Sequence, residues 1–235
     1  MIPKIIHYCW FGRGEKPALA LKCIESWKKH LPDYEIKEWN EDNFDVNLIQ
    51  YTKDAYQAKK YAFVSDYARI WILYHFGGVY FDTDVEVIKP MDELIKQGSF
   101  MGCEIDGGKN GIAVAPGLGL ATEPQNQIYS EILNVYSNLN FRNNDGTINL
   151  YAIVRITTDT LIKHGLKEIT GIQTIENIKI YPAEYFNPMN SLTGELNCTP
   201  NTYSIHLYMN SWSSPYARFK NKVGRVIRRI INYFK

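Results

Sequence analysis

The stretch that decides the fold is Tyr61–Ile88, which reads YAFVSDYARIWILYHFGGVYFDTDVEVI. Its first part is apolar at helical spacing and ends in a Gly-Gly pair, so we expect a helix over residues 61–76. Apolar and polar residues then alternate from Val79 to Ile88, which predicts a single strand that ends at Pro90. A helix that leads directly into such a strand indicates a mixed α/β sheet.

The flanking sequence fits the same class. We expect strands over residues 4–10, 34–39, 99–104 and 111–115, and helices over 17–31 and through much of 122–167. The 235 residues are enough to bury one substantial core, and we place a single α/β domain over residues 1–217.

Composition and cysteine usage describe an ordinary globular protein. Hydrophobic residues make up 45% of the chain and charged residues 22%, which argues against disorder. The four cysteines are widely spaced and form no CxxC or zinc pattern, so we expect free thiols in a reducing cytosol. The residues from Met1 to His7 lack a signal-peptide layout, and no apolar run approaches the roughly 20 residues that span a bilayer. We therefore expect a cytoplasmic protein.

The end of the sequence differs from the rest in charge. The net charge is +1, yet all seven charged residues between Arg218 and Lys235 are basic. Apolar residues there recur at helical spacing, which predicts a basic amphipathic C-terminal helix over 218–235 that binds an anionic membrane surface. Docking of this helix on the acidic remainder of the chain is the alternative. We expect no nucleic-acid binding, because the basic residues occupy one short tail.

Asp82 and Asp84 form a D-x-D pair inside the predicted strand. Residues two apart on a strand share a face, so both carboxylates would project together. Hard divalent cations bind such oxygens and recruit phosphate oxygens from a substrate. The tripeptide is a weak signal alone, since it is also common in solvated turns. Asp66 and Arg69 strengthen it, because their i, i+3 spacing puts an ion pair on one face of the preceding helix.

Three motifs around this pair resemble a known family. The runs S-D-Y-A-R-I (65–70), F-G-G-V-Y (76–80) and F-D-T-D-V (81–85) resemble the core of glycosyltransferase family 32, whose members carry a DXD sugar-binding motif, and the glucosyltransferase domains of the large clostridial toxins. The opening I-P-K-I-I-H-Y-C-W (2–10) and the segment from His206 to Trp212 resemble the family's first and last motifs. The resemblance implies a GT-A, Rossmann-like α/β fold with a mixed central sheet, Mn²⁺ or Mg²⁺ as cofactor, and retention of anomeric configuration.

The resemblance also implies roles for the charged residues. Asp84 corresponds to the direct metal ligand, and Asp82 to a residue that assists the metal or touches the donor sugar. His206 would complete the metal shell. Asp66 and Arg69 correspond to the pair that holds the sugar hydroxyls and the diphosphate, and with Asp82 and Asp84 they form the expected catalytic set. The alternatives are a surface ion pair for Asp66 and Arg69 and a structural role for His206.

Four further residues belong to the donor site by the same resemblance. Trp10 corresponds to an aromatic residue that stacks on the nucleobase, and Tyr8 lies in the same motif. Ser211 and Trp212 correspond to a loop that closes over the diphosphate. Packing alone is the alternative for Trp10 and Trp212.

The resemblance predicts a hexosyltransferase that moves a hexose or N-acetylhexosamine from a nucleoside-diphosphate sugar to a glycan. We expect a UDP-sugar, with GDP as the alternative, and a lipid-linked oligosaccharide acceptor in capsule, O-antigen or exopolysaccharide synthesis. The enzyme would lie peripherally on the inner face of a bacterial cell membrane. The alternative is a non-catalytic nucleotide-sugar or glycan-binding protein on the same fold. A structural Ca²⁺ site is disfavoured, because D-T-D-V-E lacks the glycine-centred loop of an EF-hand.

Overall fold

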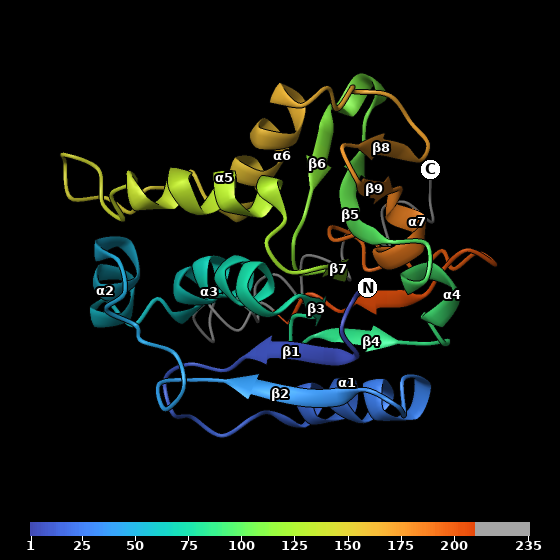
Figure 1. The fold of residues 1–235 in the computed structure, drawn as a ribbon, viewed down its shortest axis with the longest axis horizontal. Helices are drawn as coiled ribbons and strands as arrows, with labels where there is room; N and C mark the ends of the chain where they lie inside the picture. The colour runs from blue at the N-terminus through green and yellow to red at the C-terminus, as the bar shows by residue number, and fades with distance from the viewer. Residues whose placement is uncertain (210–235) are drawn as a thin grey trace.

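The chain forms a mixed sheet with helices on both faces. The computed structural model describes residues 1–209 (Figure 1). The strands are β1 (Ile5–Cys9), β2 (Glu35–Trp39), β3 (Gly78–Tyr80), β4 (Val85–Val87), β5 (Ser99–Asp106), β6 (Ile112–Val114), β7 (Leu120–Thr122), β8 (Gln173–Ile175), β9 (Ile178–Tyr181) and β10 (Ser204–His206). The helices are α1 (Ala18–His30), α2 (Gln50–Gln57), α3 (Tyr61–Phe76), α4 (Asp92–Ile95), α5 (Gln127–Ser137), α6 (Ile153–Lys163) and α7 (Ala183–Phe186), with a 3-10 turn over Gly108–Asn110.

Most of the strands pair into one sheet of eight. The order is β2-β1-β3-β7-β5-β9-β8, and β6 pairs with β5 outside this path. Strand β1 is parallel to β2 and β3, and β5 is parallel to β9, whereas β7 runs antiparallel to both β3 and β5. Strands β4 and β10 form a separate antiparallel pair. The mixed sheet expected from the sequence is confirmed.

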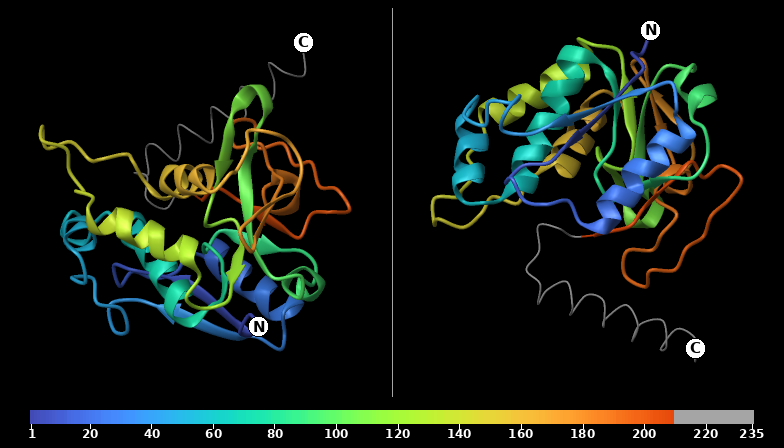
Figure 2. Two further views of the ribbon diagram at one scale, coloured as in Figure 1. Left: turned by 45° about the horizontal axis from the view of Figure 1, so that its top comes forward. Right: turned by 90° about the horizontal axis from the view of Figure 1, so that it is seen from below.

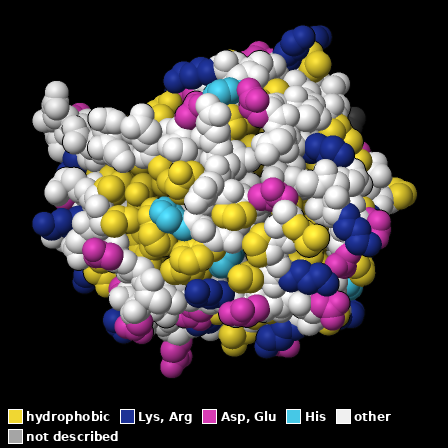
Figure 3. Space-filling view, viewed as in Figure 1, with side chains coloured by type: hydrophobic (Ala, Val, Ile, Leu, Met, Phe, Trp, Pro, Cys, Tyr) yellow, Lys and Arg dark blue, Asp and Glu magenta, His cyan; other side chains and the backbone are white. Residues whose placement is uncertain are grey.

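Alternation along the strands divides the core into two layers. In β3, Val79 packs on one face and Tyr80 on the other, and Phe100 and Met101 of β5 divide in the same way. Helices α2, α3, α5 and α6 cover the face of Tyr80, while α1, α4 and α7 cover the face of Val79 (Figure 2). Figure 3 shows that hydrophobic side chains also gather on the outer surface over α3, where Phe76 is 41% exposed.

The helix expected over residues 61–76 is confirmed as α3. It ends because Gly77 has φ = 63°, a left-handed conformation that favours glycine. Gly78 follows at φ = 98°, and a Cβ there would come within 2.7 Å of the Ile5 carbonyl oxygen. The Gly-Gly pair thus both ends the helix and lets β3 approach β1 closely.

The single strand expected from Val79 to Ile88 is wrong. After Tyr80 the chain leaves the large sheet, because the Asp82 amide donates to the Gly117 carbonyl at 3.0 Å. The Val85 amide then donates back to the Asp82 carbonyl at 3.0 Å, which closes a turn. Strand β4 continues from this turn and pairs with β10. Asp82 and Asp84 therefore lie in a turn and not on one face of a strand.

A buried histidine fixes the strands beneath this turn. The Trp39 indole donates to His7 Nδ1 at 3.0 Å, so the imidazole proton sits on Nε2 and is donated to the Gly77 carbonyl at 3.0 Å. Burial lowers the pKa of His7 to about 4, with a smaller effect from Lys37, so the ring is neutral at physiological pH. The Phe81 amide donates to the His7 carbonyl at 3.2 Å, so the residue that precedes the turn is also held against β1.

Other expectations have mixed outcomes. The stretch 122–167 contains α5 and α6, but residues 138–152 between them are not helical. Cys9, Cys23, Cys103 and Cys198 are free, as predicted. Within residues 1–209, no helix combines the length and the apolar character needed to cross a bilayer. The helix predicted over 218–235 lies outside the described residues.

Candidate active site

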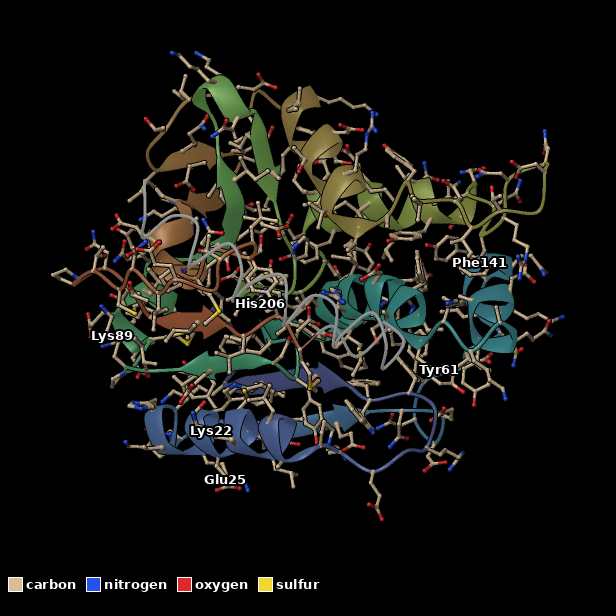
Figure 4. All side chains as sticks on the ribbon, turned by 180° about the vertical axis from the view of Figure 1, so that it is seen from behind. Lys22, Glu25, Tyr61, Lys89, Phe141 and His206 are labelled. Atoms are coloured by element: carbon tan, nitrogen blue, oxygen red, sulfur yellow. The ribbon has the colours of Figure 1, made fainter. Side chains whose placement is uncertain are left out.

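The candidate site forms where β1 and β3 end. Carboxyl ends of parallel strands meet at one edge of a sheet, which is where open α/β sheets bind ligands. Strand β1 ends at Cys9 and β3 at Tyr80, and the turn that carries Asp82 and Asp84 follows directly. Figure 4 shows the molecule from behind, with His206 labelled near the middle of the view, between α3 and β4.

Arg69 is the centre of the site. Its guanidinium donates through Nη2 to Asp66 Oδ1 at 2.9 Å and through Nη1 to Asp82 Oδ2 at 3.0 Å. The Pro116 carbonyl accepts a further bond from Nη1, and the Arg69 side chain is only 6% exposed. One buried fork therefore holds carboxylates from α3 and from the turn in fixed positions. The expected Asp66–Arg69 pair is confirmed, and it is not a surface pair.

Charge in this cluster is strongly perturbed. Burial raises the pKa of Asp66 to about 7, although Arg69 opposes the shift. Burial would also lower the pKa of Arg69, but Asp82 and Asp66 outweigh it, and the pKa stays well above its ordinary value. Arg69 therefore stays charged, and burial makes Asp66 a weaker acid than an ordinary aspartate. Perturbed groups of this kind concentrate at functional sites.

Asp84 points to a different set of partners. Its Oδ2 accepts a hydrogen bond from the Met209 amide at 2.8 Å, and its Oδ1 lies 3.3 Å from His206 Nε2. Burial would raise the pKa of Asp84, but the neighbouring His206 and the Met209 amide lower it below its ordinary value. Burial lowers the pKa of His206, but the nearby Asp84 carboxylate raises it by more, so the pKa of His206 lies above its ordinary value. The environment of Asp84 thus favours a carboxylate with a positive neighbour.

The predicted metal ligands are near one another in the fold, but they do not form a closed shell. Asp82 faces Arg69, and Asp84 faces His206. Among residues 1–209, no three His, Cys, Asp or Glu side chains gather as a metal-binding group. The Nδ1 atom of His206 is buried without a hydrogen-bond partner among the described residues. Mg²⁺-type sites often use one or two carboxylates and complete their shell with substrate phosphates, and the donors present fit that kind of site.

Two further predicted donor residues, Tyr8 and Trp10, make their hydrogen bonds outside this cluster. The Tyr8 ring packs edge-on against Trp27 in the core, and its hydroxyl donates to Glu38 Oε2 at 2.5 Å. Trp10 follows β1 at the edge of the site, is partly buried, and donates from Nε1 to the Gly14 carbonyl at 2.7 Å. Ser211 and Trp212 lie outside the described residues. The structure therefore joins Asp66, Arg69 and Asp82, and does not bring Tyr8 to them.

Three residues of the site escaped the sequence analysis. The Tyr80 hydroxyl donates to Asp82 Oδ1 at 3.2 Å, so the Asp82 carboxylate is held from two sides. After β6, the Pro116 carbonyl accepts a hydrogen bond from Arg69, and the backbone of Gly117 lies against Asp82. Proline and glycine have no side-chain group that could bind a ligand or a metal. The only sequence signal for this contact was the glycine, which often marks a place where two backbone segments come close together.

Gly117→Ala is expected to reduce activity by about 100-fold, since a displacement near 1 Å can have that effect. A Cβ at this position would overlap Asp82 Oδ2 and lie 2.7 Å from Arg69 Nη1, so the Asp82 side chain would have to turn away. The protein should stay folded, because the nearest atoms that must move are the ends of the Asp82 and Arg69 side chains and not backbone. Donor turnover and circular dichroism would be measured with Gly14→Ala as control, since a Cβ there meets nothing within 4 Å. Equal turnover in both variants would contradict the assigned role of Asp82.

A hollow opens beside Asp66. Its volume is about 520 Å³, within the range of roughly 300–1,000 Å³ usual for ligand pockets. Strand β6 contributes Ala113 to its wall, and α6 contributes Val154, Thr158 and Ile162. The Val114 amide donates to Thr158 Oγ1 at 2.9 Å, which fixes α6 against β6. The hollow is thus a formed part of the fold.

Comparison with known proteins shows which proteins the chain is similar to. Residues 17–101 match the family described as "glycosyltransferase sugar-binding region containing DXD motif", and this range includes Asp66, Arg69, Asp82 and Asp84. An uncharacterized glycosyltransferase of Acanthamoeba polyphaga mimivirus is 25% identical over 230 residues, which cover 91% of this chain and 84% of that protein. Inositol phosphoceramide mannosyltransferase 1 of Schizosaccharomyces pombe is 29% identical over 111 residues, or 43% of this chain and 33% of that protein. The matched region therefore spans about a third of that yeast relative.

Solved structures agree on the fold. The PaToxG glycosyltransferase superposes with a TM-score of 0.52 over 69% of each chain, at 19% sequence identity. At this identity the likeness concerns the fold alone. The GT-A α/β fold with a mixed sheet, expected from the sequence, is confirmed.

Proposed function

We propose that this chain, a glycosyltransferase that carries the DXD-containing sugar-binding region, transfers a hexose or N-acetylhexosamine from a nucleoside-diphosphate sugar to a glycan acceptor. The observation that carries the proposal is the cluster that the buried Arg69 forms with the part-exposed Asp66 and Asp82 at the carboxyl ends of the parallel strands. It offers two carboxylates and a cation in fixed positions, which is what recognition of a sugar's hydroxyls requires.

Asp84 and Asp82 would hold a divalent cation, Mn²⁺ or Mg²⁺, with His206 at its edge. Carboxylate oxygens suit both metals, and an imidazole suits Mn²⁺ better than Mg²⁺. Such a cation supplies neutralisation of the negative charge that grows on the departing diphosphate. His206 already lies 3.3 Å from Asp84 and holds it in place within the fold.

The residues of the chain would bind and orient the two reactants. Asp66 and Asp82, fixed by Arg69, would bind the donor-sugar hydroxyls, and the ring of Trp10 would stack on the base. The acceptor oxygen then bonds to the anomeric carbon on the face from which the nucleoside diphosphate leaves. The bond from that carbon to the β-phosphate oxygen breaks, and the acceptor proton passes to that departing oxygen. Retention of configuration follows from attack on the same face.

The preferred donor is a UDP-sugar. A GDP-linked mannose is the second candidate, and it is favoured by the similarity to inositol phosphoceramide mannosyltransferases. We also propose a lipid-linked acceptor, a role in capsule, O-antigen or exopolysaccharide synthesis, and attachment of residues 218–235 to the inner face of a bacterial membrane. These proposals rest on the sequence resemblance and on the basic charge of that tail.

A donor panel tests the proposal. UDP- and GDP-linked sugars would be incubated with the full chain, with and without Mn²⁺, and free nucleoside diphosphate would be measured. We expect metal-dependent release from one donor, because transferases slowly hydrolyse their own donor. Tight metal-dependent nucleotide binding by calorimetry with no release from any donor, even with glycan acceptors added, would instead favour a non-catalytic binding protein.

A further inference from the structure

We propose that the hollow beside Asp66 is the acceptor subsite and that it takes a neutral glycoside with an apolar aglycone. The inference rests on the proposed function, because it assigns the acceptor side of the same site. Three features carry it: continuity with the Arg69 cluster, the sign of the charge in the hollow, and exposed aliphatic side chains at its rim.

Asp66 connects the hollow to the Arg69 cluster, because it belongs to both. Its Oδ1 accepts the bond from Arg69, and its side chain also lines the hollow and stays 14% exposed. Transfer requires the acceptor hydroxyl to lie within contact of the donor sugar. A cavity that shares a wall with the residues proposed to bind that sugar is therefore where the acceptor has to enter.

The charge of the hollow favours an uncharged sugar. Three carboxyl groups line it, those of Asp66, Asp159 and Glu168; Arg69 pairs with Asp66 and Arg155 with Asp159, so the carboxyl of Glu168 lies outside these pairs and leaves the hollow acidic. Arg155 lies 3.9 Å from Asp159, which also accepts a hydrogen bond from the Tyr151 hydroxyl at 3.0 Å. Carboxylates accept hydrogen bonds from sugar hydroxyls but repel a phosphate. The group that sits in the hollow is thus a neutral sugar and not an anionic headgroup.

The rim of the hollow favours an apolar aglycone. Leu150 is 79% exposed and Ile162 is 42% exposed, and both line the hollow. Ile112 and Ile153 continue the apolar wall inward. Single exposed aliphatic residues are common on protein surfaces, but two that line the same hollow, next to further apolar wall, mark a place where apolar ligand surface is covered.

The test compares methyl and octyl glycosides of glucose, galactose, mannose and N-acetylglucosamine on the full chain. Binding is measured by saturation-transfer NMR, and transfer is measured with the active donor. We expect at least one octyl glycoside to bind about tenfold or more tightly than its methyl counterpart, since burial of only a few methylenes suffices for that ratio. In the Leu150→Ser/Ile162→Ser double variant this preference should fall to about threefold or less, because apolar area at the rim is lost.

The matched control is Leu21→Ser on α1, where the leucine is 51% exposed and lies outside the site. It should keep the wild-type preference. Equal binding of octyl and methyl glycosides, an unchanged preference in the double variant, or equally tight binding of octyl phosphate would overturn the inference. The ratio is taken within one variant, so a general loss of activity does not imitate the effect. Octyl preference without any donor turnover would contradict the proposed function while supporting the subsite.

Discussion

Replacement of Arg69 by Met is expected to reduce donor turnover by about 100- to 1,000-fold, in line with the loss of one preorganised donor at an active site. The variant should also lose up to about 3 kcal/mol of unfolding free energy, the lower end for a broken buried pair, because Asp66 and Asp82 lose their cation but are themselves 14% and 30% exposed. Nucleoside-diphosphate release and urea unfolding measure the two effects.

Two companion variants separate activity from stability. Arg69→Lys keeps the charge but loses the guanidinium fork that reaches Asp66, Asp82 and Pro116 together. Compared with Arg69→Met, it should therefore recover more of the lost stability than of the lost activity. The triple variant Arg69→Met/Asp66→Asn/Asp82→Asn removes the charges together and should recover much of the stability while staying inactive. Arg13→Met, which breaks an exposed pair with Asp42, is the control and should change stability by less than about 1 kcal/mol. Normal turnover in a folded Arg69→Met variant would refute the assigned site.

Asp84→Asn is expected to reduce metal-dependent donor turnover by roughly 100-fold or more, since even residues that only support a metal ligand typically change metal affinity 10- to 100-fold. The amide keeps the size of the side chain and can still accept the bond from the Met209 amide, so the fold should persist. Turnover would be titrated against Mn²⁺ for the wild type and the variant.

The control for this substitution is Asp33→Asn, because Asp33 is an exposed acid whose pair with Lys4 is 3.6 Å long. It should leave the Mn²⁺ dependence unaltered. If Asp84→Asn retained near-normal turnover with the same Mn²⁺ dependence, Asp84 would not be the metal ligand. His206 and Asp82 would then have to be reconsidered, since both were assigned together with it.

Arg69 ties the candidate site to the rest of the fold. It joins α3 to the nearby turn after β3, and it also joins both to the loop after β6, where Pro116 is 47 residues away in the sequence. The same loop supplies Gly117, whose carbonyl holds the Asp82 amide. Because these contacts share residues, substitutions among them should be strongly non-additive.

The sequence by itself determined the elements whose signals are local. Helix α3 was predicted to its last residue, because helical spacing and the Gly-Gly end act within one segment. The i, i+3 spacing of Asp66 and Arg69 correctly predicted their ion pair for the same reason. The mixed sheet also followed from the order of the elements, and the motifs around Asp82 and Asp84 correctly predicted the match to the DXD-containing glycosyltransferase region.

The tertiary structure alone decided the geometry of the D-x-D pair. Alternation from Val79 to Ile88 is compatible with one strand, but distant carbonyls of His7 and Gly117 accept the amides of Phe81 and Asp82 and fold the segment into a turn. The carboxylates then face different partners, Asp82 towards Arg69 and Asp84 towards His206. The periodicity of a sequence indicates which face of a segment is buried. The partner of a buried amide or carboxylate depends on how segments that are distant in the sequence pack against it.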